Sequence, residues 1–215
     1  MVVIEKGDEL VELCEKLIRF ALKTKNVIAK SKLAAAMMIL SGIRAGPLLT
    51  GKIVVKPGST SHSIVFKKHA NAPSTPETPL LCEASLFVQA AAELKRMQNG
   101  VTMTTTQADD AYKNVIGQHL SKMCSVSPKT HRLTSGDARW IFVALCYRKH
   151  NYAQLGVRLQ EFVDWVSRAG TRHAKIPTDR IVAKDSDALA NFSEAAQTPL
   201  PKPLAAKVAK RMWKV

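Results

Sequence analysis

Apolar residues recur at every third or fourth position along most of the chain, which is the period of a helix that buries one face. The first such run covers residues 8–24, where we expect an amphipathic helix. The next run, residues 27–43, is apolar on all sides at Leu33–Leu40 and predicts a buried helix. The adjacent Gly46 and Pro47 are expected to end this helical region.

The period then changes to that of strands. Residues 52–56 and 63–67 are short, rich in valine and isoleucine, and separated by a Pro-Gly-Ser-Thr-Ser turn, so they predict a β-hairpin. The hairpin is basic, and its four lysines are Lys52, Lys56, Lys67 and Lys68. Because strand residues of one parity share a face, the first two project together, and one of the last two joins their row.

The second half of the chain returns to helical patterns. The expected helices are residues 83–96, a helix capped by Thr106 that runs to Met123, a helix from Gly136 to Lys149 capped by Ser135, residues 158–168, and residues 185–196. Residues 69–80 are rich in proline and read as a loop between two lobes.

These patterns predict a mainly α fold with a two-lobed helical core, one basic β-hairpin and flexible terminal arms. The expected division is 1–76 for the N-terminal helices and hairpin, 77–197 for a helical C-terminal lobe, and 198–215 for a C-terminal arm. The arm follows a Thr-Pro-Leu-Pro-Lys-Pro break and is amphipathic and basic, which suits docking on a neighbouring subunit or a frayed tail.

The net charge of the chain indicates which kind of molecule it binds. The formal net charge is +15, and residues 16–76 contain no aspartate or glutamate. A folded protein this basic repels itself unless a polyanion binds it, and nucleic acid is the commonest such partner.

Several classes of protein are disfavoured. No nucleotide-binding or hydrolase motif occurs, so we expect no enzyme and no cofactor. The cysteines are far apart and the histidines lack metal-ligand spacing, which indicates buried thiols in a reducing compartment and no metal site. The longest apolar run is shorter than the roughly 20 residues of a membrane span, and the acidic start is unlike a signal peptide, so we expect a soluble, unprocessed protein.

Two later segments also mix cations with candidate contact residues. Residues 147–152 place Arg148 and Lys149 near Tyr152, which either stacks on a base or packs in the core. A cluster of cations lies at and after the end of the helix predicted at 158–168, where it either binds phosphate or complements the helix dipole; its members are Arg168, Arg172 and Lys175. The hairpin lysines have an alternative role as well, which is protection of an exposed strand edge.

Taken in order, these segments resemble the nucleocapsid proteins of tospovirus-like plant viruses, which have segmented negative-strand RNA genomes. The resemblance is carried by FALKTKNVIAKSKLAAAMMIL at 20–40, GKIVVK at 51–56, IVFKK at 64–68 and FVALCYRKHNYAQLGV at 142–157. It implies a two-lobed helical core with RNA in a basic cleft and arms that clasp neighbouring protomers. It also implies RNA contacts at Lys67 with Lys68 and at Asn151 with Tyr152, although the family has a basic residue where this chain has Asn151.

A second resemblance points to tyrosine recombinases. LSGIRAGPLL at 40–49 is similar to their first arginine motif, and SGDARWIFVAL at 135–145 is similar to their His-x-x-Arg helix. This resemblance implies that Arg44, Lys67 and Arg139 surround a scissile phosphate.

The chain departs from the recombinase pattern at three points. Gly136 replaces the histidine, Pro47 stands where an acidic residue follows the arginine, and no tyrosine occurs after Tyr152. Without that hydroxyl no covalent phosphotyrosine forms in cis. On this reading the chain is an inactive DNA-binding protein.

The sequence therefore predicts a nucleic-acid-binding protein that is not an enzyme. The first reading is a viral nucleocapsid that polymerises on single-stranded RNA, located in the virion and host cytoplasm; the alternative is the inactive recombinase-like DNA binder, and a ribosome-associated basic protein also fits the charge. The candidate contacts are Arg44, Lys52, Lys56, Lys67, Lys68, Arg139, Arg148, Lys149, Tyr152, Arg168, Arg172 and Lys175.

Overall fold

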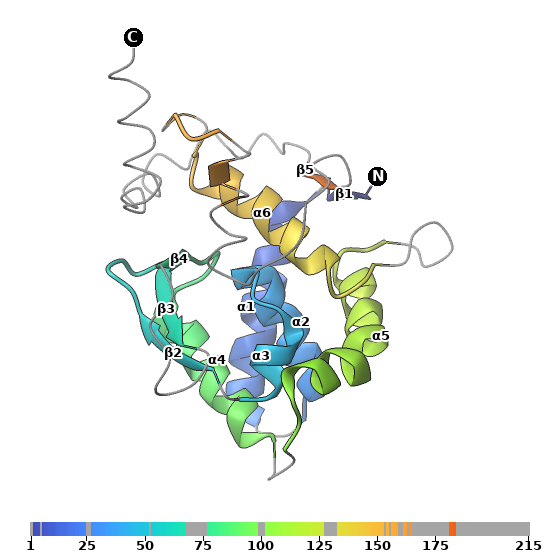
Figure 1. Cartoon of the computed structure of the whole chain (residues 1–215). Helices are drawn as coiled ribbons and strands as arrows, with labels where there is room; N and C mark the ends of the chain where they lie inside the picture. Colours follow the sequence, from blue (N-terminus) through green and yellow to red (C-terminus); the bar gives the residue numbers. More distant parts are fainter. Residues whose placement is uncertain are drawn as a thin grey trace.

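The computed structural model describes residues 2–4, 6–24, 27–51, 53–67, 77–98, 102–126, 133–152, 154, 156–158, 161, 162, 164 and 181–183. The described helices are α1 (Gly7–Thr24), α2 (Lys30–Ser41), α3 (Ala45–Leu49), α4 (Ala84–Arg96), α5 (Thr105–Met123) and α6 (Asp137–Lys149) (Figure 1). The prediction of a mainly α fold with a basic hairpin is confirmed. The predicted helix at 185–196, the arm at 198–215 and the loop at 69–76 lie outside the described residues, and of the helix predicted at 158–168 the structure describes residues 161, 162 and 164 as helical.

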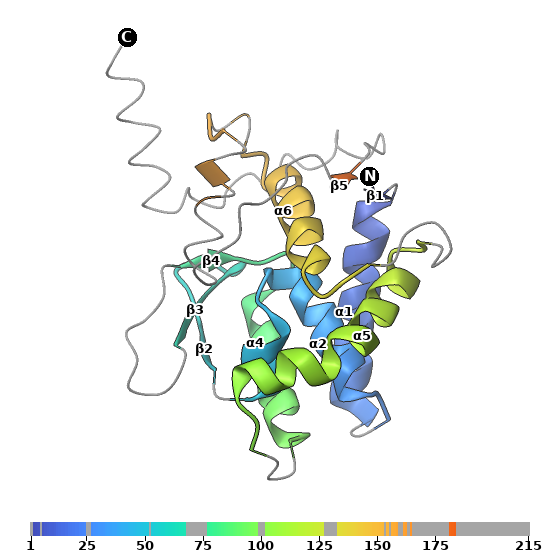
Figure 2. The same ribbon diagram turned by 45° about the vertical axis from the view of Figure 1, so that its right-hand side comes forward.

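Helix α2 is the centre of the molecule. Every residue of Leu33–Leu40 is at most 2% exposed, as its apolar pattern predicts. The helix contacts α1, α3, α4, α5 and α6, which together surround it (Figures 1 and 2). Burial of apolar surface around α2 is the main source of stability of this core.

The chain turns after α2 into a further short helix, which the sequence did not predict. Gly46 and Pro47 were expected to end helical structure, but both lie in the first turn of α3. The N–H groups of a first helical turn have no partner within the helix, so proline at this position removes no hydrogen bond. That expectation was therefore wrong.

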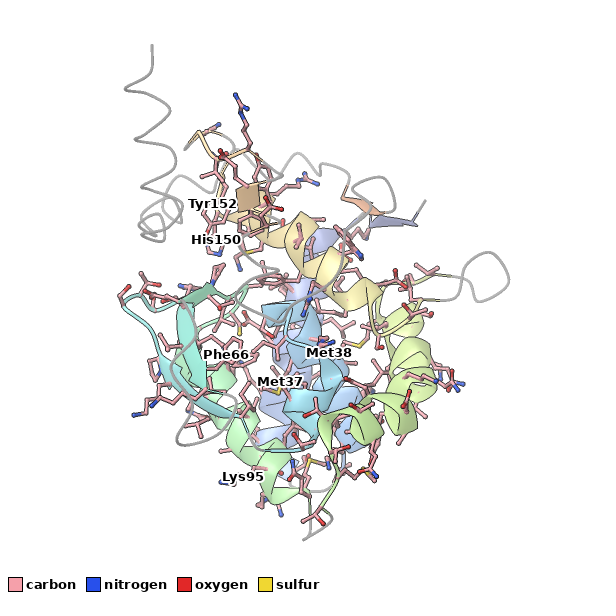
Figure 3. All side chains as sticks on the ribbon, in the orientation of Figure 1. Met37, Met38, Phe66, Lys95, His150 and Tyr152 are labelled. Atoms are coloured by element: carbon pink, nitrogen blue, oxygen red, sulfur yellow. The ribbon has the colours of Figure 1, made fainter. Side chains whose placement is uncertain are left out.

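A three-stranded antiparallel sheet packs against α4. Strands β2 (Val54–Pro57) and β3 (Ser63–Lys67) form the predicted hairpin, and β4 (Thr78–Pro79) pairs with β3 on its other side. The expected loop thus ends in a strand. Ile64 and Phe66 are buried and face the helices, and Figure 3 shows Phe66 on the side of the sheet toward Met37 and Met38 of α2.

The starts of α5 and α6 differ from the prediction. Thr104, and not Thr106, caps α5: its hydroxyl accepts a hydrogen bond from the Gln107 N–H at 3.2 Å, while the Gln107 side chain accepts one from the Thr104 N–H at 2.9 Å. Helix α6 begins at Asp137 without a cap from Ser135. Instead, the Asp137 carboxylate accepts hydrogen bonds from the N–H and hydroxyl of Thr134, both at 2.7 Å.

A second, two-stranded sheet joins distant parts of the chain. Strand β1 (Val2–Ile4) pairs in parallel with β5 (Ile181–Ala183), and β5 contacts α6. Neither strand is predicted by the sequence, because two apolar triplets so far apart carry no local signal of pairing. In the part of the chain described here, no helix combines the length and apolar character that a membrane crossing requires.

Candidate functional site

The loop between α2 and α3 carries the first candidate residue. Helix α2 ends at Gly42, whose φ of 67° is left-handed and whose N–H donates to the Met38 carbonyl. Arg44 follows in extended conformation at the N-cap position of α3, and its side chain is exposed. The loop is anchored to α5, because the Gly46 N–H donates to the Asp109 carboxylate at 2.6 Å.

Helix α6 brings the second arginine to the same loop. The Nε of Arg139 donates to the Gly42 carbonyl at 3.1 Å across 97 residues of sequence. One turn further along α6, the Phe142 ring lies so close to Gly42 that a Cβ there would meet its Cδ1 at 2.5 Å. Gly42 therefore allows the close approach that holds α6, and with it Arg139, against the end of α2.

The two arginines are electrostatically coupled. Burial, and then the nearby charge of Arg44, lower the pKa of Arg139 to about 10, so the guanidinium group of Arg139 is charged at neutral pH. Within the residues that the structure describes, Arg44 makes no salt bridge. Two like charges held together in this way favour an anion beside them, and the planar guanidinium fork suits a phosphate or a carboxylate.

The hairpin presents two of the predicted lysines on one face. Val54 pairs with Lys67, and Lys56 pairs with Val65, so the two lysines share a face of the sheet, opposite to the one that buries Phe66. The predicted row is confirmed for this pair, whereas Lys52 and Lys68 lie outside the described residues. Because β2 is an edge strand, protection of that edge remains an alternative role for Lys56.

The end of α6 does not present the site that the sequence suggested. Tyr152, at the end of α6 (Figure 3), is 1% exposed, and its ring lies 4.8 Å from that of Phe162. The prediction that it stacks on a base is therefore wrong, and the packing alternative is correct. The Lys149 ammonium donates to the Leu81 carbonyl at 2.7 Å and connects α6 to the segment after the sheet. Arg148 is partly buried, and Arg168, Arg172 and Lys175 lie outside the described residues.

The neighbouring His150 is also part of the core. It contacts the Leu80 carbonyl through Nε2 at 3.0 Å, and burial lowers its pKa to about 4. It is therefore neutral at physiological pH and adds no charge for a polyanion. Thus the structure brings Arg44 and Arg139 together and assigns Lys149, His150 and Tyr152 to the packing of α6.

The thiols are structural, as the sequence predicts. Cys14, Cys82 and Cys146 are buried and Cys124 is partly buried, all as free thiols. Burial raises the pKa of Cys82 and of Cys124 to about 12, which makes them poor nucleophiles. The described part of the chain contains no cluster of three or more metal-ligating side chains.

Two residues that position the arginines were missed by the sequence analysis. The Gly42 carbonyl orients Arg139, and a glycine after an apolar helix is a usual C-cap signal that could have located it. Asp109 fixes the start of α3, but no pattern in the sequence links a carboxylate to an amide 63 residues away.

Neither a family model nor a curated protein matches the sequence. Among solved structures, the fold is similar to protelomerase TelA covalently complexed with substrate DNA, with a TM-score of 0.59 and 14% identity over 97% of this chain and 63% of that one. A TelA mutant complexed with a DNA hairpin product gives a TM-score of 0.60 and 13% identity, over 98% of this chain and 63% of that one. Protelomerase TelK complexed with substrate DNA gives 0.52 and 16%, over 87% of this chain and 41% of that one.

The chain thus spans less than two thirds of the length of the proteins that it matches. These similarities support the resemblance to tyrosine recombinases, and none of them supports the nucleocapsid reading. At such low identity they show the fold alone, which this chain shares with part of these protelomerases.

Proposed function

We propose that this chain binds duplex DNA without cutting it, and that Arg44 and Arg139 hold one backbone phosphate between them. The observation that carries the proposal is the placement of both arginines at the end of α2, where Arg139 donates to the Gly42 carbonyl two residues before Arg44. A phosphate placed beside both groups offsets their mutual repulsion and can accept paired N–H bonds from each. The matched proteins are complexes with DNA, which favours DNA over RNA as the polyanion.

The hairpin supplies a second group of charges. Lys56 and Lys67 share one face of the sheet, and each can neutralise a phosphate as a point charge. These contacts carry no base information, so binding is expected to depend strongly on salt and weakly on sequence.

A covalent step is not part of the proposal. The chain contains three tyrosines, Tyr112, Tyr147 and Tyr152. The first lies beneath the Lys30 ammonium, the second donates its hydroxyl to the Val157 carbonyl at 2.6 Å, and the third is buried. Burial raises the pKa of both Tyr147 and Tyr152, which disfavours the phenolate that attacks a phosphate. That the chain is not an enzyme stays a prediction.

A competition assay tests the function. Labelled duplex DNA bound to the protein is displaced by unlabelled duplex DNA or by single-stranded RNA of equal length at fixed salt. We expect duplex DNA to compete better, Arg44→Ala to weaken binding about tenfold or more, and Lys95→Ala to leave it unchanged. Lys95 is an exposed lysine at the end of α4 remote from α6, so it controls for loss of charge alone (Figure 3). Stronger competition by RNA would return the nucleocapsid reading to first place.

A further inference from the structure

A second group of cations lies at the opposite end of α2 from Arg44 and Arg139. There, the first turn of α2 packs against α5 through two contacts. The Ser31 hydroxyl and the His119 Nε2 are 3.1 Å apart, and the Lys30 ammonium lies 5.9 Å from the centre of the Tyr112 ring. These two contacts hold the first turn of α2 against α5, so side chains of both helices form one surface there.

Two further lysines border this surface. Burial, and then the charges of Lys32 and Lys122, lower the pKa of His119, so one lysine from each helix lies near the same imidazole. Both lysines are exposed, and neither forms a salt bridge with a residue in the described ranges. By contrast, Lys113, also exposed on α5, pairs with Asp110 at 3.5 Å.

We propose that this cluster of Lys30, Lys32, His119 and Lys122, called the α2–α5 patch, binds the flanking backbone of the same DNA duplex that Arg44 and Arg139 hold. The inference rests on the proposed function and extends it to a second contact. At 1.5 Å per residue, the 12 residues of α2 separate the two groups by about 18 Å, which is the rise of about five base pairs. One duplex is therefore long enough to reach both.

The charges of the chain favour DNA over a second copy of the protein as the occupant. Three of the four acidic side chains that a copy offers on α1 are already paired, Glu9 with Lys6, Glu12 with Lys16 and Glu15 with Arg19. Docking on them would exchange existing ion pairs for new ones, whereas a DNA backbone brings uncompensated negative charge and releases counterions.

Paired lysine variants test the patch. In Lys32→Ala/Lys122→Ala, two phosphate contacts are lost, so we expect about tenfold weaker binding to a duplex of about 24 base pairs and a salt dependence whose slope falls by about two. Lys95→Ala/Lys113→Ala removes the same charge elsewhere and should retain wild-type affinity. An equal loss in this control variant overturns the inference.

The His119 ring gives a readout that does not depend on mutation. Phosphates beside Lys32 and Lys122 offset their charge, so the pKa of His119, followed by NMR titration of the ring protons, should rise when the 24-base-pair duplex is added. If duplex DNA does not bind the wild-type protein at all, the proposed function fails. If it binds, but the double variant binds equally well and the pKa of His119 does not move, the inference about the patch fails alone. Loss of self-association in the double variant, with DNA binding intact, also overturns it in favour of a protein partner.

Discussion

The carboxylate of Asp109 on α5 accepts a 2.6 Å hydrogen bond from the backbone N–H of Gly46 on α3. A charged acceptor on a partly buried amide is among the stronger hydrogen bonds in a protein. Gly46 is two residues after Arg44, so this hydrogen bond helps to fix the backbone from which the Arg44 side chain extends.

Replacing Asp109 by alanine should therefore weaken both stability and DNA binding. We expect the free energy of unfolding to fall by about 2 kcal/mol, because the Gly46 N–H loses its partner. Urea unfolding and fluorescence anisotropy with duplex DNA measure the two effects. Asp110→Ala is the matched control: its carboxylate is exposed and pairs only with Lys113 among the contacts described, so it should change stability by less than about 0.5 kcal/mol. Equal effects of the two substitutions would contradict the positioning role of Asp109.

Inorganic sulfate should stabilise the wild-type protein by binding between Arg44 and Arg139. At ten times its Kd, an anion specific for the folded state adds about 1.4 kcal/mol and raises Tm. Sodium chloride at equal ionic strength controls for screening of the +15 net charge. Arg44→Ala should remove most of the sulfate effect and Lys56→Ala should retain it. If both variants respond like the wild type, the anion binds elsewhere.

Gly42→Ala should destabilise the fold by about 1–3 kcal/mol. The substitution places a Cβ at a φ of 67° and within 2.5 Å of the Phe142 ring, so α2 and α6 must move apart. Gly136→Ala is the control, since φ there is −68° and the new Cβ would meet only the Thr134 hydroxyl at 3.5 Å. Thermal or urea unfolding of the two variants compares them directly, and we expect Gly136→Ala to be neutral or stabilising.

The hairpin turn should become less stable at acid pH, because it is the ionised carboxylate of Glu77 that stabilises it. Its carboxylate accepts hydrogen bonds from the Ser59 N–H at 2.6 Å and from the hydroxyls of Ser59 and Ser63. Burial alone would raise the pKa of Glu77, but these hydrogen bonds outweigh it and lower the pKa. The stabilisation is then complete above the unfolded-state pKa of about 4.3 and is lost as pH falls through the lower pKa of the folded state.

Glu77→Gln tests this pH dependence. At pH 7 the variant should be less stable by about 1 kcal/mol, because an amide is a weaker acceptor than a carboxylate. The difference between the two proteins should shrink as the pH is lowered from 5 toward 2, measured by urea unfolding at each pH. If the difference in the free energy of unfolding stays constant over that range, the charge of Glu77 does not stabilise the turn.

Tyr152→Phe should not weaken DNA binding. The Tyr152 hydroxyl is buried without a hydrogen-bond partner among the described residues, so its removal should leave stability equal or raise it by up to about 1 kcal/mol. Tyr152→Ala, which also removes the contact with Phe162, should cost about 3–5 kcal/mol. Anisotropy and urea unfolding of both variants separate packing from base stacking. A phenylalanine variant that loses DNA affinity would restore a direct contact for this residue.

The helices and the hairpin could be predicted because their signals are local. The all-apolar run at Leu33–Leu40 predicts a buried central helix, and the alternating pattern around Lys56 and Lys67 predicts a strand pair with both lysines on one face. The pairing of Arg44 with Arg139 was reached only through the resemblance to recombinases, because periodicity contains no information about which residues meet across 95 positions of chain.

The errors at the end of α6 have a different physical cause. Tyr152 stands among polar and basic residues in the sequence, which suggests an exposed ring, but Asn151 adopts a positive φ of 50° and the chain turns back so that Tyr152 packs against Phe162. A left-handed asparagine is a usual way to end a helix, and it redirects the chain that follows. Its effect on burial is tertiary and leaves no trace in the pattern of neighbouring residues.

The parallel pairing of β1 with β5 bears on how the protein is prepared. The backbone of Val2–Ile4 pairs with that of Ile181–Ala183, so removal of residues 2–4 removes the strand on which a segment about 180 residues later is aligned. Preparations that differ only in these leading residues should therefore be compared before a difference in behaviour is attributed to the segment around Ile181–Ala183.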